Sequence, residues 1–387
     1  MAKNKTAFFA AALAVLILAA VVGLRAKEMA VPPAEEALPT PAPSAAAEPP
    51  HVHRYDPLDG RCRDCGAICD HGGGLREGQC VDCGWHCDHA RHDGESLLCL
   101  VCGELCCHHF TMAGRCEGCG REAPLAAAEL PDRFFEPSEH EGRCLSETLT
   151  APDGTELPIA LWLPYNGEEA GPCNVVILLH GDGGSCEDWV SRELPTRRGN
   201  VQLCRVYDRI AQERLCAPFL VVSISTRGME DPEYGEKLIA ETLLPYLARS
   251  YPTWMTGDSR EEIAAAREHI AIGGLSRGSM YAYSVGMGRC LDVAANFCCF
   301  SNGYEPGLVQ RLTAEPYASL PIQSYVATVG LRDEPDYVRP HRQHYALLCE
   351  GVPQLRDGVN ARMLEIDEGH NFLMWSASIY DALLLMF

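Results

Sequence analysis

From residue 144 to its end, the chain alternates short apolar runs with longer segments of helical periodicity, and this alternation leaves few folds open. It predicts a mostly parallel β-sheet flanked by helices, that is, an α/β domain. The run at 155–166 alternates apolar and polar residues and predicts an edge strand. A helical pattern covers 235–251. Five further strands are expected, at 174–180, 218–225, 269–275, 323–330 and 361–367.

A serine lies between glycines where the third of these five strands is expected to end. The letters GLSRG, residues 274–278, form a G-x-S-x-G motif followed by a helical pattern. A nucleophile elbow has this context, because its tight strand-to-helix turn requires glycines and lifts the serine hydroxyl above the sheet. So short a motif also arises by chance, so the assignment of Ser276 as a nucleophile depends on an acid and a base following it.

An acid and a histidine do follow, each just beyond a predicted strand. Asp333 comes after the fourth strand and His370 after the fifth. Loops at the carboxyl ends of parallel strands are where such sheets place their chemistry, and Ser, acid, His is the chain order of this triad. We therefore predict that His370 is the general base and that Asp333 orients it. Glu334 and Asp336 compete with Asp333 for the acid's role.

A glycine-rich turn, within the letters LLHGDGGSCEDW, follows the first of the five strands. Backbone N–H groups in such a turn stabilise the oxyanion of a tetrahedral intermediate. We predict that the N–H of Asp182 is one donor and that the N–H of Arg277, directly after the nucleophile, is the other. A phosphate-binding loop is the alternative, but the GK[ST] ending is absent. His180 ends a different strand and is expected to support the site.

The segment at 51–121 repeats a metal-ligand pattern. A CxxCG motif occurs four times, and pairs of Cys or His separated by one residue lie before each. Two ligands, a loop of about eight residues and then two more ligands suit a tetrahedral zinc ion. Grouping each CxxC with the preceding pair gives four complete sets: His51, His53, Cys62 and Cys65; Cys69, His71, Cys80 and Cys83; Cys87, His89, Cys99 and Cys102; and Cys106, His108, Cys116 and Cys119.

The opposite grouping leaves His51 and His53 without partners and the last CxxC incomplete. Cys107 and His109 could each replace a neighbouring ligand. A disulfide-stapled module is the alternative to zinc, but it gives the regularly spaced histidines no role. We expect up to four structural zinc ions, none required for catalysis because no set has an open position. A protein or glycan could be the partner of this array.

The N-terminus has the pattern of a membrane-targeting segment. Ala7–Leu24 contains no charge and is mostly apolar, with basic residues on both sides. Residues 1–27 are either a signal peptide or an anchoring helix, and the anchor is favoured because the only acceptable cleavage position ends at Gly23. A Pro/Ala/Glu-rich linker follows at 28–50, and a second linker is expected at 122–143. The protein is thus expected either to be anchored in the membrane at the cell surface or to be secreted.

Overall charge excludes one class of partner. The formal net charge is -21 and the isoelectric point is near 5.0. Nucleic-acid binding needs clustered Lys and Arg to displace counterions from phosphates, so we expect no nucleic-acid partner despite the zinc-ribbon-like motifs.

Several stretches together resemble a known family. LLHGDGGSCEDW, TLLPYLARSYP, GGLSRGSMYAYSVGM, VGLRDEPDY and EGHNFLMW occur in the order found in the α/β-hydrolase carbohydrate esterases of the feruloyl and acetyl-xylan esterase type, also called the esterase D or enterochelin-esterase-like group. The resemblance covers 144–387 and implies the α/β-hydrolase fold and ester hydrolysis by Ser276, Asp333 and His370. Two positions differ from the family: Arg277, where an apolar residue such as methionine is frequent, and Ser279, where a second glycine is usual.

These features predict a membrane-anchored serine carboxylic ester hydrolase acting on ester-decorated carbohydrate or related acyl esters. Arg277 would either favour a carboxylate-bearing substrate or be held in a structural ion pair. One alternative is a binding protein whose zinc array recognises a partner, with an inactive hydrolase domain. Another is a serine peptidase on the same fold, which would use the same residues.

Overall fold

The computed structural model describes residues 109–117, 120–165, 171–303 and 305–387, and the backbone of two short strands, β1 (Leu75–Arg76) and β2 (Gln79–Cys80). The predicted N-terminal helix, the linker at 28–50 and most zinc ligands lie outside these residues, so those predictions stay predictions. Of the ligands, Cys116 is described with its side chain and Cys80 by its backbone alone. The described residues contain no cluster of His, Cys, Asp and Glu that could hold a metal. They also contain no helix that is long and apolar enough to cross a membrane.

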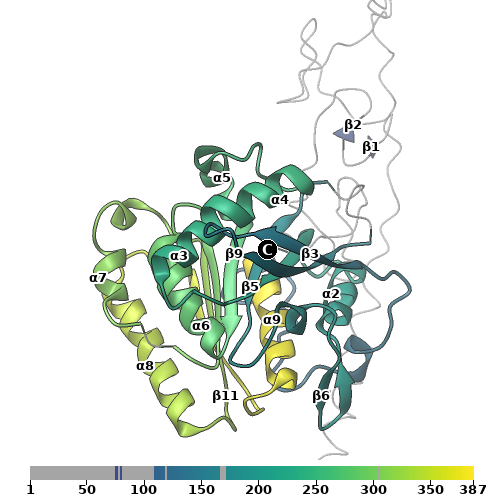
Figure 1. The fold of residues 1–387 in the computed structure, drawn as a ribbon. Helices are drawn as coiled ribbons and strands as arrows, with labels where there is room; N and C mark the ends of the chain where they lie inside the picture. Colours follow the sequence, from purple (N-terminus) through teal and green to yellow (C-terminus); the bar gives the residue numbers. More distant parts are fainter. Residues whose placement is uncertain (1–74, 77–78, 81–108, 118–119, 166–170, 304) are drawn as a thin grey trace, which may run out of the picture. The chain divides into compact units, whose positions relative to one another are not determined.

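An eight-stranded mixed sheet organises the described part of the C-terminal region (Figure 1). Its strand order is β12-β11-β10-β9-β5-β8-β4-β3, and only the two pairings made by β4, with β3 and with β8, are antiparallel. The strands are β3 (Arg143–Thr150), β4 (Glu156–Leu163), β5 (Asn174–Leu179), β8 (Phe219–Ile224), β9 (Ile270–Leu275), β10 (Asn296–Phe300), β11 (Ser324–Gly330) and β12 (Ala361–Ile366).

All five further strands that the sequence predicts are present, with ends within one residue of the prediction, and the last of them, β12, is an edge strand. The strand expected at the edge, β4, instead has β3 outside it. β10 was not predicted, because its letters NFCCF are all buried and show no alternation. A short, fully buried strand cannot be distinguished from part of a buried helix by periodicity alone.

Helices cover both faces of the sheet (Figure 1). Alternate residues of each strand point to opposite faces and build two apolar cores. One core includes residues of η3, α4 and α8, and the other includes residues of α2 and α9. The helices are α2 (Leu203–Gln212), α3 (Pro232–Glu236) continued by η3 (Lys237–Leu243) and α4 (Leu244–Ser250), α5 (Arg260–Ala265), α6 (Arg277–Tyr281) continued by η5 (Ala282–Met287), α7 (Leu308–Leu312), α8 (Pro335–Gly351) and α9 (Phe372–Met386).

The segment expected as a linker at 122–143 is packed on the domain. Leu130 and Phe134 are buried in the core that contains α9, and so is Cys116 from the preceding repeat. The Tyr380 hydroxyl donates to the Pro124 carbonyl over 3.1 Å, and other backbone groups of the segment bond to α9 and the loop before it. This stretch therefore belongs to the folded C-terminal domain and is not a free spacer.

Asp381 on α9 anchors this segment from inside the core. Its Oδ1 accepts a hydrogen bond from the Ala126 N–H over 2.7 Å, while its Oδ2 has no partner among the described residues. Burial raises the pKa of Asp381 well above its ordinary value, and the Ala126 bond opposes only part of that rise. An acid whose pKa is higher in the folded state binds more protons there, so folding stability falls as pH rises above the unfolded pKa.

We predict that Asp381→Asn removes this pH dependence. The amide keeps an acceptor for the Ala126 N–H and carries no charge, so the variant should be more stable than wild type at pH 8, by roughly 1 to 3 kcal/mol. The difference should become small at about pH 3, where the carboxyl is mostly protonated in both states. Urea unfolding at the two pH values measures this. Asp336→Asn, which changes an exposed carboxylate, is the control, and an equal effect of both variants would contradict the prediction.

Candidate active site

Ser276 lies in a strained turn between β9 and α6. Its φ of 52° is in the left-handed region that residues with a side chain rarely adopt. The turn is tight because β5 lies against it: a Cβ at Gly278 would lie 2.1 Å from the Leu179 carbonyl oxygen, and one at Gly274 would lie 2.6 Å from the Gly278 carbonyl group. Both glycines of the motif are therefore required by space, and the geometry is that of a nucleophile elbow.

The structure brings together the three residues predicted as a triad. His370 Nε2 lies 3.1 Å from Ser276 Oγ, and His370 Nδ1 lies 2.9 Å from Asp333 Oδ2. The other carboxylate oxygen of Asp333 accepts the Glu334 N–H over 2.8 Å, and the Asp333 side chain is fully buried. Glu334 and Asp336, the alternative acids, are exposed and make no hydrogen bond to His370. Nucleophile, base and orienting acid thus have the required contacts.

Aromatic side chains fix the plane of the His370 ring. Tyr337 on α8 stacks on it with ring centres 4.6 Å apart, and Trp375 on α9 meets it edge-on at 5.0 Å. The Trp375 indole N–H in turn donates to Ser301 Oγ just after β10. Neither aromatic residue was predicted, since a tyrosine or tryptophan at helical spacing gives no sequence signal of a role in a site.

A buried carboxylate, Glu368, holds the loop that carries His370. It accepts hydrogen bonds from the Gly369 N–H and the Asn371 amide, and it pairs with Arg197 and Arg332. Burial alone would raise the pKa of Glu368, but the hydrogen bonds from Gly369, Arg197 and Asn371 and the charge of Arg197 together lower it, so the group is held as a carboxylate. Nothing in the sequence distinguishes Glu368 from other loop acids.

The glycine-rich turn after β5 lies beside the nucleophile. A Cβ at Gly181 would lie 3.2 Å from Ser276 Cβ. Within the described residues, the backbone N–H groups of Asp182 and Arg277, the two predicted oxyanion donors, make no hydrogen bond. Their side chains form an ion pair. Hydrogen bonds to Asp182 and, second, to Tyr281 raise the pKa of the Arg277 guanidinium.

His180 joins this turn to the loop after β8 through its two ring nitrogens. Its Nδ1 bonds to the Gly181 carbonyl over 2.8 Å, and its Nε2 accepts the Thr226 N–H over 3.2 Å, so both ring nitrogens are engaged.

The serine at position 279, where the family usually has glycine, also has a structural reason, because its buried hydroxyl donates to the Asn302 carbonyl.

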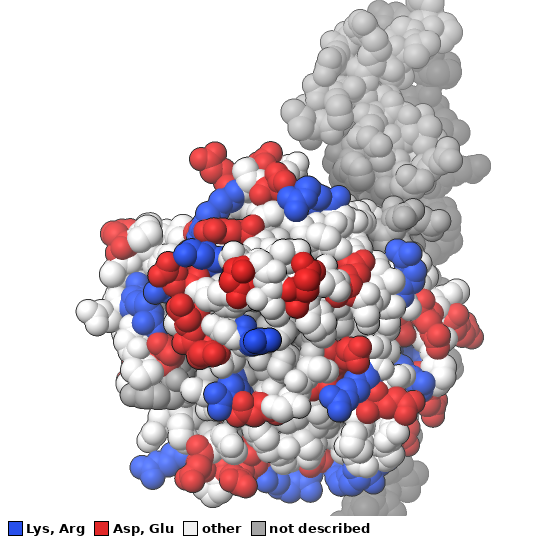
Figure 2. All heavy atoms as spheres, viewed as in Figure 1, with Lys and Arg blue, Asp and Glu red and all other residues white. Residues whose placement is uncertain are grey.

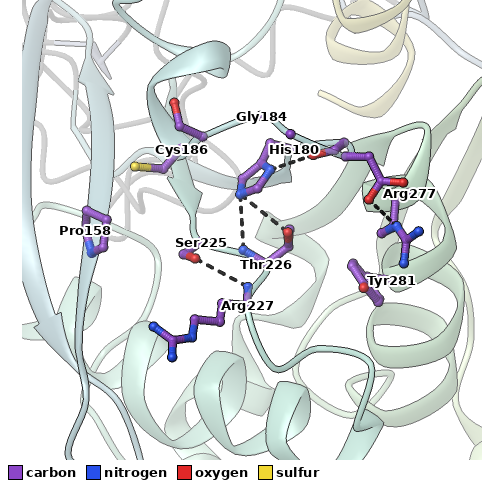
Figure 3. A pocket seen from close by; sticks show the side chains of 13 residues that line it. Pro158, His180, Gly184, Cys186, Ser225, Thr226, Arg227, Arg277 and Tyr281 are labelled. Carbon is purple, nitrogen blue, oxygen red and sulfur yellow. Dashed lines mark hydrogen bonds and ion pairs between the residues drawn. The ribbon is translucent and has the colours of Figure 1, made fainter.

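A cavity of about 350 Å³ opens beside the turn (Figure 3). It lies between the turn after β5, the loop after β8, β4 and the start of α6. The residues that line it are Pro158, His180, Gly181, Asp182, Gly183, Gly184, Ser185, Cys186, Ser225, Thr226, Arg227, Arg277 and Tyr281.

Known proteins share this fold. No family model matches the chain. Among curated proteins, the chain is 28% identical over 186 residues to endo-1,4-beta-xylanase Y of Acetivibrio thermocellus. The matched residues make up 47% of this chain and 16% of the xylanase, so the match spans about a sixth of that relative's length. Among solved structures, a serine-to-alanine mutant of the feruloyl esterase module from Clostridium thermocellum, complexed with sinapinate, has a TM-score of 0.59 at 20% identity and covers 67% of this chain and 93% of that one.

A CE1 ferulic acid esterase from Anaeromyces mucronatus, in complex with ferulic acid, has a TM-score of 0.51 at 15% identity. The match covers 68% of this chain and 97% of that one. At these identities the solved structures establish the fold: the described domain has the α/β-hydrolase fold of these esterases.

We predict that the Asp182–Arg277 ion pair positions the two oxyanion donors together. Asp182→Asn and Arg277→Met should each lower kcat by a few-fold, because the backbone N–H groups remain but their spacing is less fixed. The double variant should be no slower than the slower single variant, since either change breaks the same contact. Turnover of p-nitrophenyl acetate by the four proteins measures this, and additive losses would contradict a shared role.

Proposed function

We propose that this chain is a serine carboxylic ester hydrolase that acts on ester-decorated carbohydrate or related acyl esters. The observation that best supports the proposal is the hydrogen-bonded array of Ser276, His370 and Asp333 in a strained elbow beside an open cavity.

Acylation follows from this geometry. Ser276 Oγ attacks the ester carbonyl carbon while His370 Nε2 takes its proton, and Asp333 stabilises the imidazolium that forms. The carbonyl oxygen becomes an oxyanion facing the N–H groups of Asp182 and Arg277. When the tetrahedral intermediate collapses, the bond to the alcohol oxygen breaks and His370 gives its proton to that oxygen. Water then attacks the acyl-enzyme in the same way, and the acid leaves.

The comparisons support a carbohydrate esterase. Two of the solved structures with this fold are named a feruloyl esterase module and a ferulic acid esterase, and the first holds sinapinate. The curated relative is named a xylanase. A bulky aromatic acyl group on a plant polysaccharide fits these names better than an acetyl group, and the size of the cavity agrees. The charges on the face shown in Figure 2 are interspersed, with no broad basic patch among its described residues.

The proposal extends to the part of the chain outside the described residues. Zinc bound by the four ligand sets would fold the repeats, and the N-terminal apolar segment would attach the enzyme to a membrane with its catalytic domain outside the cytoplasm. A binding role for the zinc array is compatible with ester hydrolysis. No feature of the described site favours a peptidase.

We predict that Ser276→Ala lowers kcat/KM for p-nitrophenyl acetate and methyl ferulate by at least about a thousandfold, because the acyl-enzyme can no longer form. Spectrophotometric assays of the full chain measure this. Ser319→Ala changes an exposed serine and should leave activity intact. Turnover by a folded Ser276→Ala protein at the wild-type rate would overturn the proposed mechanism.

We predict further that the metal is structural. The full chain should contain up to four zinc ions by elemental analysis, and a chelator should remove them while turnover of p-nitrophenyl acetate stays within about twofold, because a serine triad needs no metal. Activity that disappears on chelation and returns with zinc would contradict a purely structural role.

A further inference from the structure

Two arginines line the cavity beside the nucleophile, and they differ in their partners. The Arg277 guanidinium is bound to Asp182. Arg227 is exposed, and within the described ranges its side chain makes no ion pair and no hydrogen bond. Figure 3 shows the two side chains on opposite sides of the cavity, Arg277 with Tyr281 and Arg227 on the side of Pro158. The free guanidinium is therefore the one farther along the cavity from the elbow.

The cavity extends along the carboxyl edge of the sheet, away from the general base. Its walls come from the loops after β5 and β8 and from β4, which follow β9 in the strand order. Asp333 and His370 follow β11 and β12, on the other side of β9. Ser276 thus stands between the proton-transfer residues and the cavity.

The position of Ser276 between His370 and the cavity indicates where the alcohol half and the acyl half of the ester lie. The alcohol oxygen must receive its proton from His370 Nε2, so the alcohol half lies on the His370 side. The carbonyl oxygen faces the turn after β5. The direction left for the acyl chain is away from His370, over the turn and toward β8 and β4. A cavity of about 350 Å³ is within the range of sites for whole small ligands, which are about 300 to 1,000 Å³, and far exceeds an acetyl group.

The charged residues near Arg227 determine whether it favours a neutral or an anionic group of the substrate. Arg227 also lines a second cavity, of about 300 Å³, together with Asp153, Glu230 and Asp231. The pKa of Asp153 is lowered, first by hydrogen bonding with Thr155 and in smaller part by the charge of Arg227. The Arg227 guanidinium and this carboxylate therefore interact electrostatically. The carboxylates that line this second cavity oppose the approach of a further anion to Arg227 but do not oppose a neutral acceptor.

We propose that Arg227 determines acyl specificity by donating a hydrogen bond to a neutral oxygen, a hydroxyl or ether, at the end of the acyl group remote from the ester. The proposal rests on the proposed esterase function. In this proposal the acyl oxygen is the hydrogen-bond acceptor that the Arg227 guanidinium does not find among the described residues. It also predicts which acyl groups the enzyme prefers: those long enough to cross the cavity and oxygenated at the far end.

Four methyl esters test the proposal on the full chain at pH 6.5, where a phenol is neutral. Methyl 4-hydroxycinnamate and methyl ferulate have a distal neutral oxygen, methyl cinnamate has the same frame without it, and monomethyl adipate ends in a carboxylate. Wild type should show kcat/KM for the oxygenated aromatic esters roughly ten- to a hundredfold above methyl cinnamate, the size expected for a hydrogen bond to a charged group. Monomethyl adipate should be the poorest substrate.

Arg227→Met should bring the ratio between methyl ferulate and methyl cinnamate close to one, mostly through KM, because the lost contact is present before and during the reaction. Arg227→Lys keeps one donor and should retain part of the ratio. Arg356→Met, which removes an exposed guanidinium elsewhere, is the matched control and should keep the wild-type ratio.

A wild-type ratio near one, a ratio unchanged in Arg227→Met, or a preference for monomethyl adipate would overturn the specificity role while leaving the esterase intact. Absence of turnover on every ester, p-nitrophenyl acetate included, would instead overturn the proposed function. The two failures are thus distinguishable.

Discussion

The approach of β5 to the turn after β9 is the contact on which the site depends. The Leu179 carbonyl lies where the Cβ of any residue other than glycine at 278 would be, and it also limits position 274. Because β5 and β9 pair in parallel register, this contact sets the height at which α6 starts above the sheet. It therefore fixes the positive φ of Ser276 and places the turn at Gly181 next to the serine. One steric constraint brings Ser276 together with the two backbone N–H groups that we propose as oxyanion donors.

β10, the strand between β9 and β11, sets the rest of the geometry. Neighbouring strands lie about 4.8 Å apart, so the acid after β11 is separated from the serine by two strand spacings. His370 bridges that gap. The end of β10 binds to both sides: the Phe300 carbonyl accepts the Ser276 N–H, and the Ser301 N–H donates to Thr328 on β11. The hydroxyl of Ser301 also receives the Trp375 N–H that positions the His370 ring.

Much of this could be predicted from sequence because the relevant signals are local. Ser276 and Asp333 each follow a continuous buried strand and His370 follows the edge strand β12, and parallel strands bring their carboxyl ends to one edge of the sheet. The missing elements lack such signals. β10 is short and wholly buried, Glu368 and Tyr337 are defined only by tertiary contacts, and Arg277 differs from Arg227 in forming an ion pair, with Asp182. Partner choice among surface charges is a property of the folded chain.

The segment at 122–143 shows a further limit of sequence composition, because its polarity and small residues suggest a spacer. In the fold it lies against the loop that carries His370: the Asp367 N–H donates to the Ala127 carbonyl, and Arg197 pairs with both Glu129 and Glu368. Glu368 in turn binds the backbone just before His370. A segment that follows the Cys/His repeats therefore forms part of the wall that positions His370, and the catalytic domain begins earlier in the chain than its first strand.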